Sequence, residues 1–290
     1  MLSSEEKMEY LPLIGMATFL VLVQIIALLM AKPFEASGMQ AFPEPESILN
    51  PLMYVGLILA FTLLILIIIK LDQDWFIQIF ILFAVASTMY YVFLAIISNF
   101  WISITLAVLL TLFMYLHPEW YIIDIIGVVI GAGVASIFGI SLTIIPVLVL
   151  LTALAVYDAI SVYKTKHMIT LAESVMDLKL PILFVLPRRR GYSFIKEADM
   201  EKGDAYFMGL GDAIIPSILV VSANFFIEAP YTISFINVLA LGTIIGTIAG
   251  YSILMFFVGK GKPHAGLPFL NSGAILGFLF ASAIYSVGFI

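Results

Sequence analysis

The sequence predicts an all-α membrane protein with nine transmembrane helices. Hydrophobic residues make up 63% of its 290 residues and charged residues 11%, and the mean hydropathy is +1.15. Soluble domains contain about 45–50% apolar and about 25% charged residues, so this composition is typical of a chain that crosses a bilayer several times. The apolar runs are about 20 residues long and do not alternate, which favours helices over a β-barrel.

Nine apolar runs can be drawn along the chain, each long enough for a membrane helix. A gap of some 40 residues separates the sixth run from the seventh. We therefore expect three parts: a six-helix part over 1–163, a cytoplasmic loop over 164–204 and a three-helix part over 205–290. The runs cover residues 11–31, 51–69, 75–94, 97–116, 122–138, 142–163, 205–226, 234–258 and 267–290.

Lysine and arginine set the expected orientation. The gap between the sixth and seventh runs holds most of them, including Arg188, Arg189 and Arg190. If this gap is cytoplasmic, alternation across nine spans makes every basic residue cytoplasmic except Lys32, as the positive-inside tendency requires. The N-terminus is then cytoplasmic and the C-terminus extracytoplasmic. We expect a multi-pass protein of the cell membrane, without a cleaved signal peptide because no basic segment precedes the first run.

Several chemistries lack the residues they need. The chain has no cysteine, which excludes disulfides and thiolate catalysis. The three histidines, His117, His167 and His264, lie in loops or at the ends of runs and form no HExxH motif, so we expect neither a metal nor another cofactor. No basic and aromatic residues interleave as they do in nucleic-acid-binding proteins, so we expect no nucleic-acid partner.

Two carboxylates stand inside apolar runs. Asp158 precedes Lys164 by six residues, and Asp212 follows Asp204 by eight. At a helical rise of about 1.5 Å per residue, they lie about 9 Å and about 12 Å in from the same side of the membrane. A carboxylate in lipid is costly and usually faces a partner or a cavity. Two of them at similar depth on consecutive helices predict a functional pair.

A pair of facing carboxylates can share one proton. The ionised member can then take a proton from water while the protonated member polarises a carbonyl, which together hydrolyse a peptide bond without a metal. The alternative is a proton- or cation-coupled transporter, which also uses buried acids.

Asp124 and Glu228 lie near the ends of runs, and we interpret both as interfacial charges in contact with headgroups.

The backbone around Asp212 is weakened on both sides. Gly209 and Gly211 precede it, and Pro216 removes the helical donor for its carbonyl. Glycine spacing in membrane helices often serves only close packing. Here it also suits a site where an unwound substrate segment lies against the chain. Such a segment needs backbone partners in lipid, and the apolar, proline-bounded stretch 181–186 is a candidate edge strand for it.

Tyr157-Asp158 on the sixth run and Gly209-Leu210-Gly211-Asp212 on the seventh resemble the motifs of the presenilin and signal peptide peptidase family, the GxGD intramembrane aspartyl proteases. The chain is most similar to the archaeal presenilin homologues. The resemblance covers nine helices, the long loop and a cytoplasmic N-terminus. The family's third motif, Pro-Ala-Leu, is matched in part by Ala265-Gly266-Leu267-Pro268, where the first proline and the alanine are replaced.

The resemblance implies hydrolysis of transmembrane segments, with Asp158 and Asp212 as the catalytic acids. It also implies that Tyr157 packs near the site and that seven residues shape or line its substrate-facing wall: Gly209, Leu210, Gly211, Ala265, Gly266, Leu267 and Pro268. The expected partners are transmembrane peptide substrates and the lipid bilayer. A homo-oligomer is compatible with the sequence, and no obligatory partner subunit is expected. A prepilin-type peptidase shares GxGD but has fewer spans.

Overall fold

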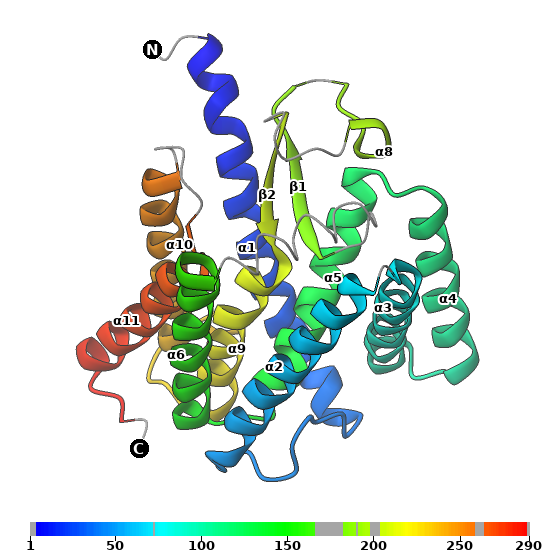
Figure 1. Ribbon diagram of the computed structural model, residues 1–290. Coiled ribbons are helices and arrows are strands. Elements are labelled where there is room, and N and C mark those ends of the chain that lie inside the picture. Colours follow the sequence, from blue (N-terminus) through cyan, green and yellow to red (C-terminus); the bar gives the residue numbers. More distant parts are fainter. Residues whose placement is uncertain are drawn as a thin grey trace.

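The structure is a computed structural model that describes residues 4–71, 73–165, 182–189, 191–197, 204–258 and 264–288. Within these ranges nine long helices form the body of the molecule (Figure 1). A π-helical turn, η1 (Ser161–Thr165), extends α6, and α8 (Phe194–Glu197) is a single short turn. The long helices are α1 (Ser4–Ala36), α2 (Leu49–Lys70), α3 (Asp74–Ile97), α4 (Phe100–Leu116), α5 (Trp120–Gly139), α6 (Ile144–Ile160), α9 (Leu210–Phe226), α10 (Val238–Val258) and α11 (Leu267–Tyr285).

The helices are apolar enough for a multi-pass membrane protein. In the described part of the chain, seven segments have the length and composition of membrane spans, and α4 and α9 are shorter apolar helices of 17 residues each. The outer helices carry large apolar side chains on their surface: Leu63 on α2 is 61% exposed and Phe83 on α3 is 69% exposed. Such a surface is stable only against lipid.

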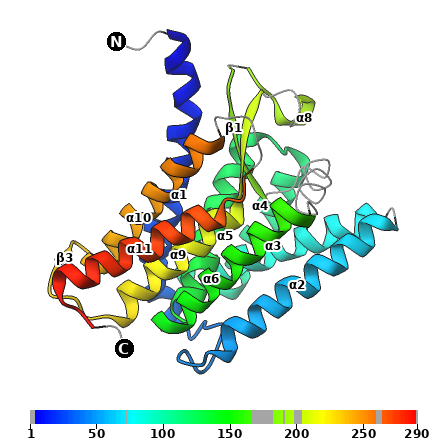
Figure 2. The ribbon, with the colours of Figure 1, turned by 60° about the vertical axis from the view of Figure 1, so that its left-hand side comes forward.

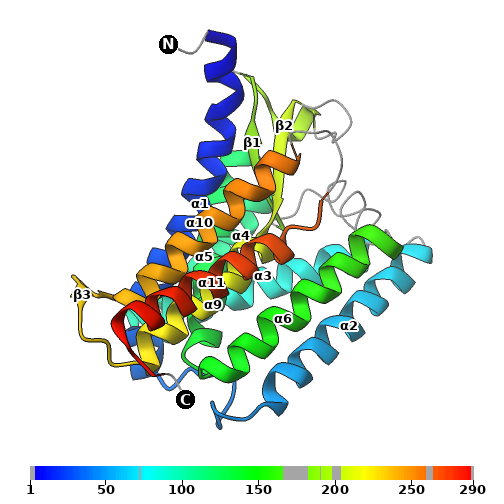
Figure 3. The same ribbon diagram turned by 90° about the vertical axis from the view of Figure 1, so that its left-hand side faces the viewer.

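Helix α9 lies at the centre of the bundle. It packs against α1, α5, α6, α10 and α11, and Figure 3 shows it behind α11 and beside α6. Nearly every residue from Ala213 to Ala223 is buried, since a helix that is apolar on all sides finds partners on all sides. The central position of α9 matters because Asp212 lies in its first turn.

The seventh apolar run does not begin as a helix, contrary to the sequence prediction. Its first five residues form strand β2 (Ala205–Gly209), which pairs antiparallel with β1 (Leu183–Pro187) from Leu183–Gly209 to Pro187–Ala205. Tyr206 and Phe207 favour a strand, and the pairing satisfies the backbone groups that the two strands direct toward each other. The hairpin stands at the same end of the molecule as the start of α1, and the C-terminus lies at the other end (Figure 1).

The eighth run also begins later than predicted. Strands β3 (Thr232–Ile233) and β4 (Ile236–Asn237) form a small hairpin whose turn places Ser234 at φ +60°, and α10 starts only at Val238. Asn237 is buried and joins two helix ends. Its Nδ2 donates to the carbonyls of Ala223 and Ile227, and its Oδ1 accepts the N–H of Ala240. These bonds fix α10 against the end of α9.

The β1–β2 hairpin is held by two carboxylates at the start of α5. Glu119 accepts bonds from the Ser193 hydroxyl and the Phe194 N–H, which caps α8. Asp124 accepts the N–H of Val185 at 2.8 Å and is 1% exposed. The prediction that Asp124 is an interfacial charge was therefore wrong, because the sequence did not show that a strand packs over it. Glu228 is exposed, as expected of an interfacial residue.

Some sequence predictions fall on residues outside the described ranges. They concern the first part of the candidate edge strand, His167 and several basic residues of the loops, which are Pro181, Lys166, Lys179, Arg190, Lys202, Lys260 and Lys262.

Helices α10 and α11 are the most closely packed pair, and they lie side by side in every view (Figures 1, 2 and 3). Gly242, Gly246 and Gly250 of α10 face Gly273 and Gly277 of α11. A Cβ atom at position 246 would lie 2.1 Å from the carbonyl oxygen of Gly273. The two backbones approach this closely only because neither helix carries side chains along the seam.

We predict that Gly246→Ala destabilises the protein by about 1–3 kcal/mol, because the added methyl group meets a backbone oxygen that cannot rotate away. Gly56→Ala is the matched control: it is also a helical glycine, but no atom lies within 4 Å of its Cβ position. Thermal unfolding in detergent measures both variants. Equal melting temperatures for the two variants would contradict the close packing of α10 against α11 at Gly246.

Candidate active site

Asp158 lies at the C-terminal end of α6, three residues before η1 begins at Ser161. It is 6% exposed. Its Oδ2 accepts the backbone N–H of Leu267, the first residue of α11, at 3.1 Å. The first N–H groups of a helix have no intrahelical acceptor, so Asp158 satisfies a donor that would otherwise be unpaired in an apolar region. A carboxylate at the N-terminus of a helix is also electrostatically favourable.

Asp212 is the third residue of α9 and is half-buried. Its carboxylate lies directly against Gly266, the residue that precedes α11. A Cβ atom at position 266 would be 2.6 Å from Oδ2 and 2.9 Å from Oδ1. A Cβ at Gly209 would be 3.4 Å from Oδ2. The side chain of Asp212 therefore occupies a space that exists because residue 266 is a glycine.

The two carboxylates meet at the start of α11. Asp158 contacts Leu267 and Asp212 contacts Gly266, which are consecutive residues. Three segments far apart in the sequence thus converge: the end of α6, the start of α9 and the start of α11. Two carboxyl groups that face the same helix start, one buried and one half-buried, can share a single proton.

The depth predicted for Asp212 needs a correction. The predicted depth assumed that the chain is helical from Asp204 to Asp212, but residues 205–209 are extended. At about 3.3 Å per residue the strand alone covers about 16 Å, more than the whole distance predicted. The two carboxylates meet nonetheless, because α9 starts well inside the bundle.

The segment matched to the Pro-Ala-Leu motif takes the positions that the site needs. Ala265 is fully buried, Gly266 faces Asp212, and Leu267 donates to Asp158. Pro268 lies in the first turn of α11, where its missing N–H costs nothing. Of these four residues, Gly266 and Leu267 contact the carboxylates directly.

The other predicted site residues lie in different environments. Leu210 is buried. Its Cδ1 lies 3.6 Å from where a Cβ atom would stand at Gly127 and 3.4 Å from where one would stand at Gly131, so it packs the start of α9 against α5. Gly211 is exposed and has no atom within 4 Å of its Cβ position, which leaves the approach to Asp212 open. The hydroxyl of Tyr157 lies 3.5 Å from Thr62 Oγ1, on the side of α6 that faces α2.

Two contacts near the site were not predicted. Tyr163 of η1 bonds to the segment before α11: its hydroxyl accepts the N–H of Ala265 and lies 3.2 Å from His264 Nδ1. Asn271 is buried and donates to the carbonyl of Leu151, which joins α11 to α6 further along both helices. A buried amide in an apolar run is a visible sequence signal for Asn271. Tyr163 gives none, since aromatic residues are common at the ends of spans.

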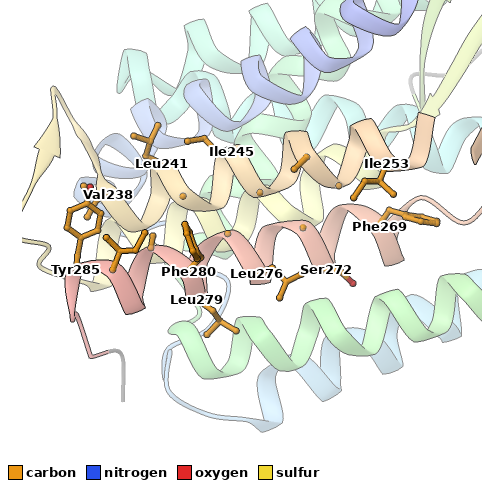
Figure 4. A pocket seen from close by; sticks show the side chains of 18 of the residues that line it. Val238, Leu241, Ile245, Ile253, Phe269, Ser272, Leu276, Leu279, Phe280 and Tyr285 are labelled. Atoms are coloured by element: carbon orange, nitrogen blue, oxygen red, sulfur yellow. The ribbon is translucent and has the colours of Figure 1, made fainter. Parts of the chain in front are cut away.

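An apolar groove of the described structure lies elsewhere. It has a volume of about 1030 Å³ and runs along the outer side of the α10–α11 pair, where apolar side chains such as Ile245, Leu276 and Phe280 line it (Figure 4). It reaches Pro268 and Phe269 at one end but contains neither carboxylate. Its position on the outer face of two membrane helices makes it part of the lipid-facing surface.

Comparisons with known proteins agree on one family. Residues 17–287 match the family model described as signal-peptide peptidase, presenilin aspartyl protease. A solved structure described as a presenilin family intramembrane aspartate protease, in the C222 space group, is 44% identical with a TM-score of 0.71, over 94% of this chain and all of that chain. A second, with the same description in the P2 space group, is 45% identical with a TM-score of 0.70, over 95% and 99% of the chains. None of the curated proteins matched the chain.

Proposed function

The chain belongs to the signal-peptide peptidase and presenilin family of aspartyl proteases, and on that premise we propose that Asp158 and Asp212 are its two catalytic acids. The protein is an intramembrane aspartyl protease; a transporter is not favoured. One observation carries the assignment to these two residues: their carboxylates contact consecutive residues at the start of α11, although they come from different helices. Each also occupies the position of an aspartate in the family's Tyr-Asp and Gly-x-Gly-Asp motifs.

The reaction follows from one shared proton. The ionised carboxylate removes a proton from a water molecule, whose oxygen attacks the carbonyl carbon of the scissile peptide bond. The protonated carboxyl group donates its proton to the carbonyl oxygen as the tetrahedral intermediate forms. Collapse of that intermediate breaks the C–N bond, and a proton passes to the leaving nitrogen. The products are a carboxylic acid and an amine, and the pair returns to a single shared proton.

The substrate is a transmembrane segment, which must unwind before its peptide bonds can be reached. Bare backbone in lipid needs hydrogen-bonding partners, and a strand edge supplies them. The sequence pointed to the β1 region, residues 181–186, as that edge. In the structure β1 is paired with β2 on one side, and on its other side Asp124 occupies the N–H of Val185. The edge that remains is that of β2.

The register supports the β2 edge as the place for the substrate. Arg188 and Leu210 donate to Asp204 and Ile182 across the hairpin, so residues 204, 206, 208 and 210 bond inward. The N–H groups of Ala205, Phe207 and Gly209 then point away from β1. The Gly209 N–H bonds to the Asp212 carboxylate, which leaves those of Ala205 and Phe207 for a substrate. This edge leads along the chain directly to Asp212, and Gly211 leaves open space beside it. A substrate strand added here runs toward the carboxylates.

The topology proposed from the sequence is compatible with the fold. Nine crossings place the start of α1 and the β1–β2 hairpin on one side of the membrane and the end of α11 on the other, and they lie at opposite ends of the molecule (Figure 1). We assign the hairpin side to the cytoplasm of a cell membrane, because the basic residues gather there. The division into parts 1–163, 164–204 and 205–290 then separates the two catalytic helices, α6 and α9.

The protein is proposed to act without obligatory partner subunits. All the residues invoked here, on α6, β2, α9 and the start of α11, come from one chain, and the two solved relatives are matched along their full length by this chain alone. The partners we propose are the lipid bilayer and the transmembrane substrate, and we propose no cofactor.

The proposal predicts that Asp158→Asn and Asp212→Asn each lower cleavage of a single-span reporter peptide by about a hundredfold to ten-thousandfold, the usual contribution of a general acid or base. The assay uses purified protein in liposomes, with products identified by mass spectrometry. Asp124→Asn is the matched control: it is the same change at another buried carboxylate, and it keeps an oxygen for the Val185 N–H. If either Asp158→Asn or Asp212→Asn cleaves the reporter at the rate of the parent protein, the assignment is refuted.

Gly266→Ala tests how closely the carboxylates must be placed. The new methyl group would lie 2.6 Å from Asp212 Oδ2, and the carboxylate can avoid it by rotating. We expect cleavage to fall between about tenfold and about a hundredfold, as small displacements of reacting groups do, while stability changes by less than about 1 kcal/mol. Gly56→Ala, which adds its methyl group in open space, controls for the substitution. Unchanged cleavage would show that Asp212 is not held against residue 266.

Phe207→Pro tests the β2 edge. Proline removes an N–H that points away from β1, so the hairpin keeps its own hydrogen bonds while a substrate strand loses one. We expect KM to rise about three- to tenfold, the value of one backbone hydrogen bond, with a smaller change in kcat. Phe207→Leu keeps the N–H and controls for the lost ring. If both variants behave alike, the substrate does not use this edge.

A further inference from the structure

The segment before α11 has a second attachment to the α6 side of the site. The N–H of Ala265 donates to the hydroxyl oxygen of Tyr163 at 3.3 Å, and that oxygen lies 3.2 Å from His264 Nδ1. The rings of Tyr163 and His264 meet edge to face, with centroids 6.2 Å apart. Phe257, near the end of α10, contacts His264 on another side. Ala265 itself is fully buried between these contacts.

The hydroxyl of Tyr163 has two hydrogen-bond partners. Its oxygen accepts the Ala265 N–H and forms a second hydrogen bond with His264 Nδ1. The hydroxyl group has one donor and two acceptor sites, so it can hold both partners at once. In this arrangement one hydroxyl group joins a backbone N–H to a side-chain nitrogen of the preceding residue, which fixes both the position and the orientation of the segment.

The two attachments of this segment differ in kind. Leu267 is bonded to Asp158, a carboxylate that must meet water and substrate during the reaction. Ala265 is bonded to Tyr163, which has no part in the proton transfers. Tyr163 lies five positions after Asp158, and Leu267 lies two positions after Ala265, so the segment is held at two points of the α6–η1 stretch. Only the Tyr163 attachment can persist unchanged through catalysis.

We propose that Tyr163 is a positioning residue for the reaction. It keeps residues 264–267 seated against the two carboxylates while the bond between Asp158 and Leu267 is exchanged for bonds to water and substrate. This role in catalysis rests on the proposed function of Asp158 and Asp212; the attachment itself does not. His264 takes part as the second hydrogen-bond partner of the Tyr163 hydroxyl.

Tyr163→Phe removes the hydroxyl and keeps the ring contact with His264. We expect kcat per active site to fall about three- to tenfold, the range of one hydrogen bond, with KM changed less than about twofold. Active sites are counted with a tight-binding peptide whose scissile bond is replaced by a hydroxyl-bearing carbon. Tyr115→Phe, the same change on the exposed side of α4, is the matched control. Equal kcat values for the two variants would overturn the proposal.

His264 separates the hydrogen bond from the bulk of the side chains. Asparagine at position 264 offers an oxygen near the place of Nδ1, whereas leucine offers no acceptor. We expect His264→Asn to retain most of the kcat and His264→Leu to lose about as much as Tyr163→Phe. Equal losses of kcat in His264→Asn and His264→Leu would contradict the role of His264 as a hydrogen-bond partner of Tyr163. If Tyr163→Phe fails to fold, His264→Leu still tests the attachment.

Amide hydrogen exchange provides a readout that does not depend on catalysis. We expect the Ala265 amide to exchange about three to ten times faster in Tyr163→Phe than in the parent, and the Leu267 amide to respond instead to Asp158→Asn. A drop in melting temperature with unchanged Ala265 exchange and unchanged kcat would mean a merely structural role and would overturn the proposal. If Ala265 responds as expected but Asp158→Asn still cleaves, the attachment stands and the assignment of the catalytic pair fails.

Discussion

The structure depends on placing two carboxylates together in a region that excludes most water. Such groups are tolerated only where neighbouring donors and a shared proton offset the lost hydration. Here the start of α11 meets this requirement. The N–H of Leu267 reaches Asp158, and the missing side chain of Gly266 makes room for Asp212. The central position of α9 and the close seam between α10 and α11 hold this one helix start against the two acids.

The β1–β2 hairpin solves a second problem of the same kind. A sheet edge inside a membrane protein is a liability, because its free N–H and C=O groups must find partners. One edge is closed by a buried side chain, Asp124 of α5, and by the packing of α5 itself. The other edge, that of β2, leads to Asp212 and is the one we propose for the substrate. A buried aspartate outside the proposed active site, Asp124, closes the opposite side of the hairpin.

Much of this was visible in the sequence. The length of the apolar runs predicted the long helices, and the isolated charges Asp158 and Asp212 predicted the pair, because both signals are local and energetically costly to ignore. The start of α9 was missed because residues 205–209 are as apolar as a membrane helix, and only their partner strand makes them extended. Asp124 and Tyr163 were missed for a related reason. Their roles depend on segments 61 and 102 residues away in the chain, which no local pattern reveals.

The most direct measurement is a structure of the protein in lipid with a peptide inhibitor that carries a hydroxyl group in place of the scissile carbonyl. We expect this hydroxyl to lie within hydrogen-bonding distance of both Asp158 and Asp212. We also expect the peptide backbone to pair with the outer edge of β2. A hydroxyl that contacts only one of the two carboxylates, or a peptide bound away from the start of α11, would contradict the assignment of these two residues as the catalytic pair.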